Sequence, residues 1–187
     1  MNIAIFASGS GTNAENITKY FQNSTSISVK LILSNKKDAY VLERARKLNT
    51  ESVFLKKEDL DNPEILLPLL KSHRIDWIVL AGYLKLIPSF LIKAFPNRII
   101  NIHPALLPKF GGKGMYGMHV HKAVVENRET ETGISIHYVN EKYDEGNIIT
   151  QFKCSVDKND TAQDVADKIH ILEMNHFPKI IDNLLTK

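Results

Sequence analysis

Asn101 and His103 are the two residues whose types and spacing first suggest chemistry. They lie at the end of a predicted strand, residues 98–102, and Pro104 follows them. Side chains two positions apart in an extended backbone point to the same side, so the two share a face. An amide can hydrogen-bond a carbonyl oxygen, and an imidazole can donate or accept a proton, so the pair favours acyl transfer. The same residues also fit a buried structural histidine with an asparagine that closes a turn.

Asp144 is the carboxylate that this chemistry would use. It lies in a polar turn over residues 140–146, which ends in Gly146. A carboxylate beside His103 would raise the pKa of the imidazole and fix its tautomer. Aspartate is also common in glycine-containing turns for conformational reasons alone. Spacing does not place the two side chains together, so their proximity is a hypothesis that the fold must decide.

A glycine-rich turn, Ser-Gly-Ser-Gly-Thr-Asn over residues 8–13, follows the first predicted strand and precedes a predicted helix. Such a turn exposes backbone N–H groups at a helix N-terminus, which makes it a candidate anion site. It lacks the lysine of a Walker A loop and the full G-x-G-x-x-G spacing, which disfavours nucleotide triphosphate hydrolysis and a dinucleotide cofactor. The alternative is a plain strand-to-helix turn that needs glycine for steric reasons.

Glu173, His119 and His121 are further candidates outside these segments. Glu173 lies close to the apolar stripe of the last predicted helix, so its carboxylate either borders a pocket or extends to solvent. The H-x-H spacing of the two histidines can suggest a metal site, but no third ligand follows at convincing spacing. We therefore predict a helix start or a loop at these histidines, and no metal site.

The elements that must position these residues alternate between strand and helix patterns. Apolar runs of strand length are separated by segments with apolar residues at three- and four-residue spacing, which is typical of βαβ units. The predicted fold class is therefore α/β, with a mostly parallel twisted sheet covered by helices on both faces. The predicted strands span residues 2–7, 29–33, 75–81 and 98–102, and the predicted helices span residues 14–21, 39–48 and 63–73.

The pattern changes after residue 102. Residues 104–117 contain two prolines and four glycines, which predicts a long loop. Segments 132–140 and 147–156 have strand character, and the polar turn between them predicts an antiparallel pair. A long C-terminal helix begins near Thr161, whose hydroxyl forms a capping box with Asp164. Pro178 is expected to kink this helix or to end its first part.

Composition limits the class of protein. The 187 residues, 43% of them hydrophobic, predict a single domain over residues 1–187. A net charge of +3 is too small to argue for nucleic acid or a membrane surface as a partner. The one cysteine, Cys154, excludes an internal disulfide, and no run approaches the ~18 apolar residues of a spanning helix. We expect a soluble cytoplasmic protein.

Taken together, five segments resemble the folate-dependent phosphoribosylglycinamide formyltransferases of purine synthesis, and the resemblance runs nearly end to end. The Asn-Ile-His-Pro-x-Leu-Leu-Pro pattern with a downstream Asp-x-Gly is specific for the wider formyltransferase fold, which is Rossmann-like. The glycine-rich turn narrows the resemblance to enzymes that act on a phosphorylated glycinamide ribonucleotide. The five segments are residues 8–13, 34–36, 80–83, 101–108 and 144–146.

The resemblance implies transfer of the formyl group of 10-formyltetrahydrofolate, a co-substrate, to the glycine amine of 5'-phosphoribosylglycinamide without a metal. The chain is expected to act as a monomer or a homodimer. The catalytic residues implied are Asn101, His103 and Asp144. The residues implied for the substrate phosphate and ribose are Gly11, Thr12, Asn13, Pro104 and Glu173. Those implied for the folate are Leu84, Lys85, Leu86, Ile87, Asn101, Asn140, Glu141, Lys142, Tyr143 and Asp144.

Two alternatives share these residues. Hydrolysis of 10-formyltetrahydrofolate would use the same site with water as the acceptor. A non-catalytic folate- or phosphate-binding module would keep the fold and bind ligands without turnover. A transfer assay with and without the ribonucleotide separates the three hypotheses.

Overall fold

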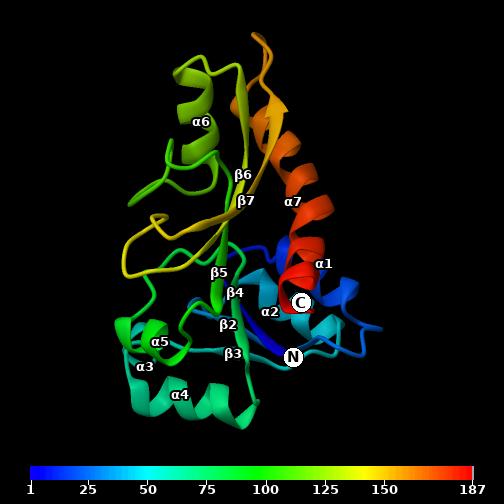
Figure 1. Cartoon of the computed structure of the whole chain (residues 1–187), viewed down its shortest axis with the longest axis vertical. Helices are drawn as coiled ribbons and strands as arrows, with labels where there is room; N and C mark the ends of the chain where they lie inside the picture. Colours follow the sequence, from blue (N-terminus) through cyan, green and yellow to red (C-terminus); the bar gives the residue numbers. More distant parts are fainter. Residues whose placement is uncertain (187) are drawn as a thin grey trace.

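The computed structural model describes residues 1–186, which form a seven-stranded sheet flanked by helices (Figure 1). The strand order is β3-β2-β1-β4-β5-β6-β7. The strands are β1 (Asn2–Ala7), β2 (Ser28–Ser34), β3 (Ser52–Phe54), β4 (Trp77–Leu80), β5 (Ile99–His103), β6 (Glu131–Tyr138) and β7 (Ile148–Ser155). The helices are α1 (Thr12–Tyr20), α2 (Tyr40–Lys47), α3 (Lys57–Leu60), α4 (Pro63–Ser72), α5 (Ser89–Ala94), α6 (Met118–Glu126) and α7 (Ala162–Leu185).

Strands β1 to β5 pair in parallel, and β6 and β7 complete the sheet in antiparallel pairs. The parallel strands are nearly unbroken apolar runs because helices cover both of their faces. In β1, every residue from Ile3 to Ala7 is buried. The α/β class, the antiparallel strands near the C-terminal part and the long last helix predicted from the sequence are confirmed.

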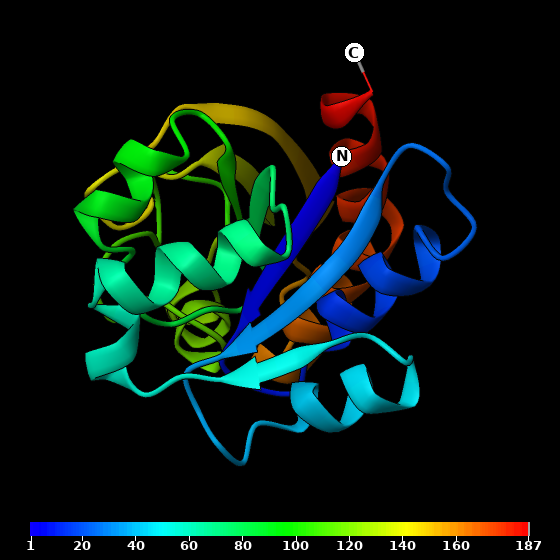
Figure 2. The same cartoon turned by 90° about the horizontal axis from the view of Figure 1, so that it is seen from below.

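Successive residues of β1 point to opposite faces of the sheet and enter two separate cores. Ile3 and Ile5 belong to the core under α1, α2 and α7, whereas Ala4 and Phe6 belong to the core under α3, α4 and α5. Figure 2 shows these two helical layers on either side of the strands. Because the sheet is held from both sides, the carboxyl ends of its central strands form a well-defined edge.

The last helix, α7, is capped as predicted, but Pro178 does not end it. Thr161 Oγ1 accepts a hydrogen bond from the Asp164 N–H, and the Asp164 carboxylate accepts one from the Thr161 N–H. A proline removes the hydrogen bond to the carbonyl four residues earlier. That carbonyl, of Met174, instead accepts a hydrogen bond from Asn16 Nδ2 at 2.9 Å. The helix therefore continues past the proline, and the prediction of an end there is wrong.

Three elements were not among those predicted, namely β3, α3 and α5, while a helix start or a loop was expected at His119 and His121, where α6 lies. The three contain between three and six residues. Elements of one or two turns are too short to show a clear hydrophobic period. The predicted loop over residues 104–117 is present, and α6 begins directly after it at Met118.

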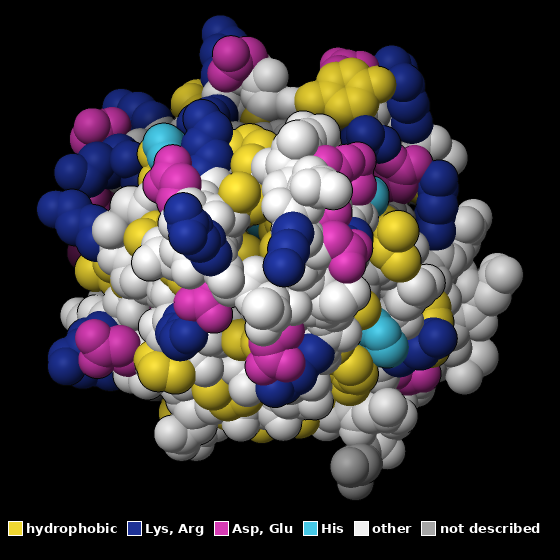
Figure 3. Space-filling view, turned by 90° about the horizontal axis from the view of Figure 1, so that it is seen from above, with side chains coloured by type: hydrophobic (Ala, Val, Ile, Leu, Met, Phe, Trp, Pro, Cys, Tyr) yellow, Lys and Arg dark blue, Asp and Glu magenta, His cyan; other side chains and the backbone are white. Residues whose placement is uncertain are grey.

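The surface carries charges of both signs. Figure 3 shows Lys and Arg side chains interspersed with Asp and Glu side chains over the face seen from above. Within residues 1–186, none of the helices combines the length and the apolar character needed to cross a membrane.

Candidate active site

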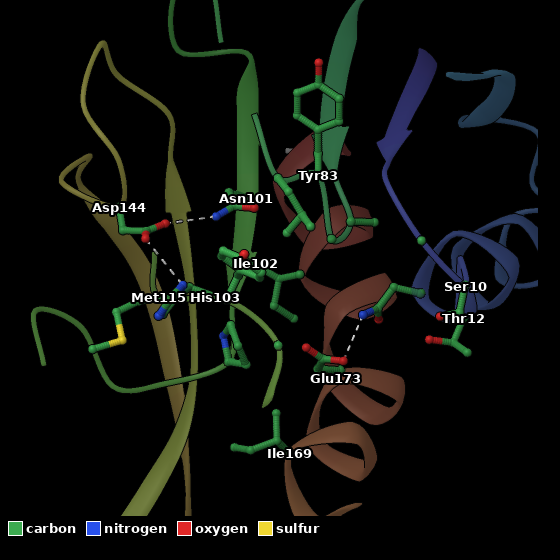
Figure 4. Close-up of a pocket in the computed structure, with 18 of the residues that line it drawn as sticks. Ser10, Thr12, Tyr83, Asn101, Ile102, His103, Met115, Asp144, Ile169 and Glu173 are labelled. Atoms are coloured by element: carbon green, nitrogen blue, oxygen red, sulfur yellow. Dashed lines mark hydrogen bonds and ion pairs between the residues drawn. The ribbon is translucent and has the colours of Figure 1, made fainter. Parts of the chain in front are cut away.

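A cavity of about 750 Å³ lies at the carboxyl ends of β1, β4 and β5. Open parallel sheets bind ligands at this edge, where the strand order reverses. Figure 4 shows side chains that face one another across the cavity, with Thr12 and Glu173 on one side and His103 and Asp144 on the other. The predicted site residues that line it are Gly11, Thr12, Asn13, Leu84, Lys85, Asn101, His103, Pro104, Tyr143, Asp144 and Glu173.

His103, the last residue of β5, lies between a carboxylate and a backbone carbonyl. Its side chain is buried, with Nδ1 3.5 Å from Asp144 Oδ2 and Nε2 2.8 Å from the carbonyl oxygen of Phe110. Asp144 reaches this position from a turn in which its own φ is +56°, a conformation that aspartate adopts more readily than most residues. The Gly112 N–H donates to the same carboxylate oxygen at 2.9 Å. Folding thus brings together an imidazole and a carboxylate that are distant in sequence.

Asn101 joins this group through His137, a residue that the sequence analysis did not assign to the site. Asn101 Nδ2 lies 3.1 Å from His137 Nε2 and 3.4 Å from Asp144 Oδ1. The other ring nitrogen of His137 lies 2.8 Å from the Tyr138 carbonyl oxygen. His137 Nε2 also lies 3.6 Å from Asp144 Oδ1, so this nitrogen accepts from Asn101 in one tautomer of the ring and donates to Asp144 in the other. The sequence alone does not point to His137. Its place in the site follows from the register between β5 and β6, which sets His137 directly opposite Asn101.

Burial changes the ionisation of the pair. It lowers the pKa of His103 below its usual value, and the nearby Asp144 carboxylate offsets only part of this effect. Burial alone would raise the pKa of Asp144, but the hydrogen bond to His137, the charge of His103 and the Gly112 N–H together lower it. The predicted effect of Asp144 is confirmed, since its charge raises the pKa of His103, but burial outweighs it and the net shift is downward. Asp144 is ionised at neutral pH, whereas His103 is mostly neutral.

The opposite side of the cavity is built from the glycine-rich turn. Gly11 is the N-cap residue of α1 with φ +75°, and no side chain caps this helix. The first N–H groups of a helix have no partner within the helix, so here they are left for a ligand in the cavity. Gly11 is also required by packing, since a Cβ at this position would lie 2.8 Å from the Cα of Val41.

Glu173 borders the cavity next to this turn, rather than extending to solvent. Asn13 Nδ2 donates to Glu173 Oε2 at 2.9 Å. Burial raises the pKa of Glu173 to about 7, and the hydrogen bond from Asn13 opposes that rise. The buried Oδ1 of Asn13 has no hydrogen-bond partner among the described residues. Glu173 therefore places its carboxyl group beside the uncapped N–H groups at the start of α1.

A second cavity of about 740 Å³ adjoins the first and shares Asn35, Tyr83 and Tyr143 with it. Its walls combine apolar side chains with charged ones, among them Lys85 and Lys113, which line both cavities. The predicted folate residues that line it are Lys85, Leu86, Ile87, Glu141 and Tyr143.

The other five predicted folate residues do not line this second cavity. Leu84, Asn101 and Asp144 line the first cavity only. Asn140 and Lys142 line neither cavity, because the Asn140 side chain accepts a hydrogen bond from the Lys142 N–H and the Lys142 ammonium pairs with Glu145. The polar side-chain groups of these two residues are thus used within the turn, and their part in folate binding stays a prediction.

His119 and His121 lie in the first turn of α6, as the prediction of a helix start required. The His119 ring contacts Tyr116 edge to face, with ring centroids 5.3 Å apart. His121 is buried, lines the first cavity and leaves Nδ1 without a partner among the described residues. Burial and the nearby His103 lower the pKa of His121. Among residues 1–186, no group of three or more His, Cys, Asp or Glu side chains is arranged to hold a metal ion.

Comparison with known proteins gives one consistent result. The family model described as formyl transferase matches residues 1–181. The chain is 44% identical over 173 residues to a protein named chloroplastic phosphoribosylglycinamide formyltransferase from Arabidopsis thaliana, and this match covers 89% of the chain. A Bacillus subtilis protein named phosphoribosylglycinamide formyltransferase is 35% identical over 187 residues, which is 97% of the chain and 93% of that protein.

Solved structures agree with this result. The structure of a protein named phosphoribosylglycinamide formyltransferase from Bacillus halodurans superimposes with a TM-score of 0.88 at 36% identity, covering 100% of the chain and 96% of that structure. The corresponding structure from Anaplasma phagocytophilum gives a TM-score of 0.91 at 28% identity, covering 100% of the chain and 87% of that structure. The chain spans 59% of the length of the Arabidopsis relative and 60% of that of a second plant relative, from Vigna unguiculata.

Proposed function

The chain belongs to the formyl transferase family, and we propose that it transfers the formyl group of 10-formyltetrahydrofolate to the glycine amine of 5'-phosphoribosylglycinamide in purine biosynthesis. The names of its relatives support this reaction. The observation that carries the proposal is the cavity itself, in which the His103–Asp144 pair faces the Gly11 turn and Glu173. One small phosphorylated substrate can reach both sides.

The ribonucleotide would occupy the first cavity. The free N–H groups at the start of α1, at Thr12 and Asn13, suit a phosphate because they donate hydrogen bonds and lie at the positive end of the helix dipole. Glu173 suits the ribose, since a carboxylate accepts hydrogen bonds from two neighbouring hydroxyls. Pro104 borders the path between Glu173 and His103 and would limit where the glycine amine can lie.

The formyl donor would occupy the second cavity with its reactive end towards the first. Flat heterocycles are bound between apolar walls with a few polar groups at their edge, and Phe6, Ile87 and Leu91 supply such walls here. Tyr143 and Asp144 follow in the adjoining turn, so a ring held in this cavity would end beside the His103 pair. Lys85 and Lys113 add positive charge for an anionic tail. The bound donor supplies the activated one-carbon group.

The reaction would take place where the two cavities meet. The amine nitrogen bonds to the formyl carbon, the bond from that carbon to the folate nitrogen breaks, and one proton passes from the amine to the folate nitrogen. Negative charge develops on the formyl oxygen, and N–H donors of Asn101 and His103 can stabilise it. Burial, which keeps His103 mostly neutral beforehand, also strengthens its interaction with a developing anion.

Asp144 would have two roles in this reaction. Its ionised carboxylate orients the His103 ring and stabilises the protonated form of that ring, which is the minor form at neutral pH. It also lies beside the reacting atoms, so it can carry the amine proton to the leaving nitrogen, directly or through a water molecule.

A spectroscopic assay tests the proposal. The purified chain is mixed with 10-formyltetrahydrofolate, with the ribonucleotide present and then omitted. We expect folate release only when the ribonucleotide is present, and loss of release in His103→Ala with folate binding retained. Equal release without the ribonucleotide would instead support hydrolysis, and tight binding of both ligands without turnover would support a binding module.

A further inference from the structure

Ser8 joins the two segments that lead into the two cavities. It follows the last residue of β1 and is 1% exposed. Its hydroxyl donates to Asn35 Oδ1 at 2.6 Å and accepts from the Leu84 N–H at 3.0 Å. Its own N–H donates to the Gly82 carbonyl oxygen at 3.0 Å. One residue thus bonds to the connections that follow both neighbouring strands, β2 and β4.

The position of Ser8 in the sheet explains why it can do this. Strand β1 lies between β2 and β4, and its ladder ends at Ala7, paired with Ser34, and at Phe6, paired with Leu80. Beyond these pairs the three strands continue into loops. The Ser8 hydroxyl therefore supplies hydrogen bonds between these segments at the point where the backbone pairing of the strands ends.

The three connections supply different parts of the site. Residues 9–13 and Leu84 line the first cavity, Asn35 and Lys85 line both cavities, and Leu86 and Ile87 line the second. Ser8 itself lines neither cavity. Its role is therefore in the relative placement of the two walls and not in contact with a substrate.

On the basis of the proposed function, we infer that the Ser8 hydroxyl is a positioning group that sets the 84–87 segment for the formyl donor. Removal of the hydroxyl leaves the Leu84 N–H and Asn35 Oδ1 without their partner, and an unpaired buried polar group is unfavourable. Because Leu84 is partly exposed, its N–H can regain a partner by moving towards water. Such a movement displaces the wall of the second cavity and leaves the Gly11 turn in place.

The test compares Ser8→Ala with Thr18→Val, which also removes a buried hydroxyl, one that donates to the Ala14 carbonyl and lines neither cavity. In Ser8→Ala we expect the KM for 10-formyltetrahydrofolate to rise roughly tenfold, as for one lost hydrogen bond, and the KM for the ribonucleotide to change less than about twofold. Thr18→Val should change neither KM. Equal rises in both KM values, or no rise in either, would overturn the inference.

Two further measurements separate this inference from the proposed function. Amide hydrogen exchange at Leu84, followed by NMR, should be faster in Ser8→Ala and intermediate in Ser8→Cys, which keeps a weaker donor and acceptor. Calorimetric binding of tetrahydrofolate should weaken in the same order. If the wild-type chain transfers no formyl group, the proposed function fails, while unchanged exchange at Leu84 contradicts the positioning role whatever the reaction is.

Discussion

The two sides of the first cavity are built in different ways. The turn side, residues 9–13 with Glu173, relies on the N–H groups of one short stretch of backbone. The histidine side consists of Asn101, His103, His137 and Asp144, which are side chains from β5, β6 and the turn after β6. Apart from Glu173, which reaches Asn13 from α7, the turn side is local in sequence, whereas the histidine side exists only after distant segments meet.

This difference predicts which changes each side tolerates. A backbone site depends on main-chain conformation, so it should be insensitive to side-chain chemistry and sensitive to an added Cβ. A side-chain cluster depends on charge and hydrogen bonding, so a substitution that preserves shape should still disable it. The same construction also favours different functions, since N–H groups bind a permanent anion and titratable groups handle a proton that moves.

The largest effect is expected on the histidine side. Asp144→Asn keeps the shape of the side chain but removes the negative charge 3.5 Å from His103 Nδ1. We expect kcat to fall by about two to four decades, the usual span for an acid–base group. The matched control is Glu145→Gln, an exposed carboxylate in the same turn, which should leave kcat unchanged. Turnover near the wild-type value in Asp144→Asn would remove this carboxylate from the mechanism.

The next largest effect is expected on the turn side, where a substitution of Gly11 is compared with one of Gly9. In Gly11→Ala the new Cβ lies 2.8 Å from the Val41 Cα, and φ is +75°. We expect a loss of about 2–4 kcal/mol in the free energy of unfolding and a KM for the ribonucleotide at least roughly tenfold higher. Gly9→Ala is the control, because nothing lies within 4 Å of its Cβ. Denaturant unfolding and steady-state kinetics measure both quantities, and similar behaviour of the two variants would contradict the backbone account.

The same contrast separates what the sequence could predict from what it could not. The Gly11 turn, strand β1 and the Thr161 cap follow from residues close together in the chain, and the structure contains each of them. The contact between His103 and Asp144 depends on a reversal of the chain after β6 and on a positive φ at Asp144. Neither feature can be recognised from residues that are close together in the sequence. The contact could therefore be stated only as a hypothesis, based on the motifs that contain the two residues.

Three other differences have physical causes of the same kind. The net direction of the His103 pKa depends on burial, which a spacing argument does not contain. His137 was not assigned to the site, because its position opposite Asn101 follows only from the pairing of β5 with β6. Asn140 and Lys142 were placed by family position, whereas their side chains take part in the turn itself.

A third prediction concerns the carboxylate of the turn side. The pKa of Glu173 is raised to about 7 from an ordinary 4.5, so the folded protein binds a proton more tightly than the unfolded chain. The free energy of unfolding contributed by this group is therefore present below about pH 4.5 and is lost as the pH rises to about 7. Glu173→Gln should match the wild type near pH 5 and be more stable by about 1–3 kcal/mol near pH 8.

Urea unfolding at the two pH values measures this difference. The exposed Glu145→Gln should change stability by less than about 0.5 kcal/mol at either pH. The KM for the ribonucleotide should rise in Glu173→Gln, because an amide accepts fewer hydrogen bonds from ribose hydroxyls than a carboxylate. Equal stability of Glu173→Gln and the wild type near pH 8 would show that Glu173 is better solvated than its burial indicates.

The smallest effect is expected at the start of α7, the helix that carries Glu173. Thr161→Val removes the hydroxyl that accepts the Asp164 N–H and should lower the free energy of unfolding by about 1 kcal/mol. The KM for the ribonucleotide should not change, because buried residues beyond the cap, Ile169 and Phe177, fix the helix against the sheet on both sides of Glu173. Thermal unfolding and kinetics on the same variant test the two statements together. A higher KM would mean that the cap positions Glu173 over several turns, and the turn side would then depend on remote contacts as the histidine side does.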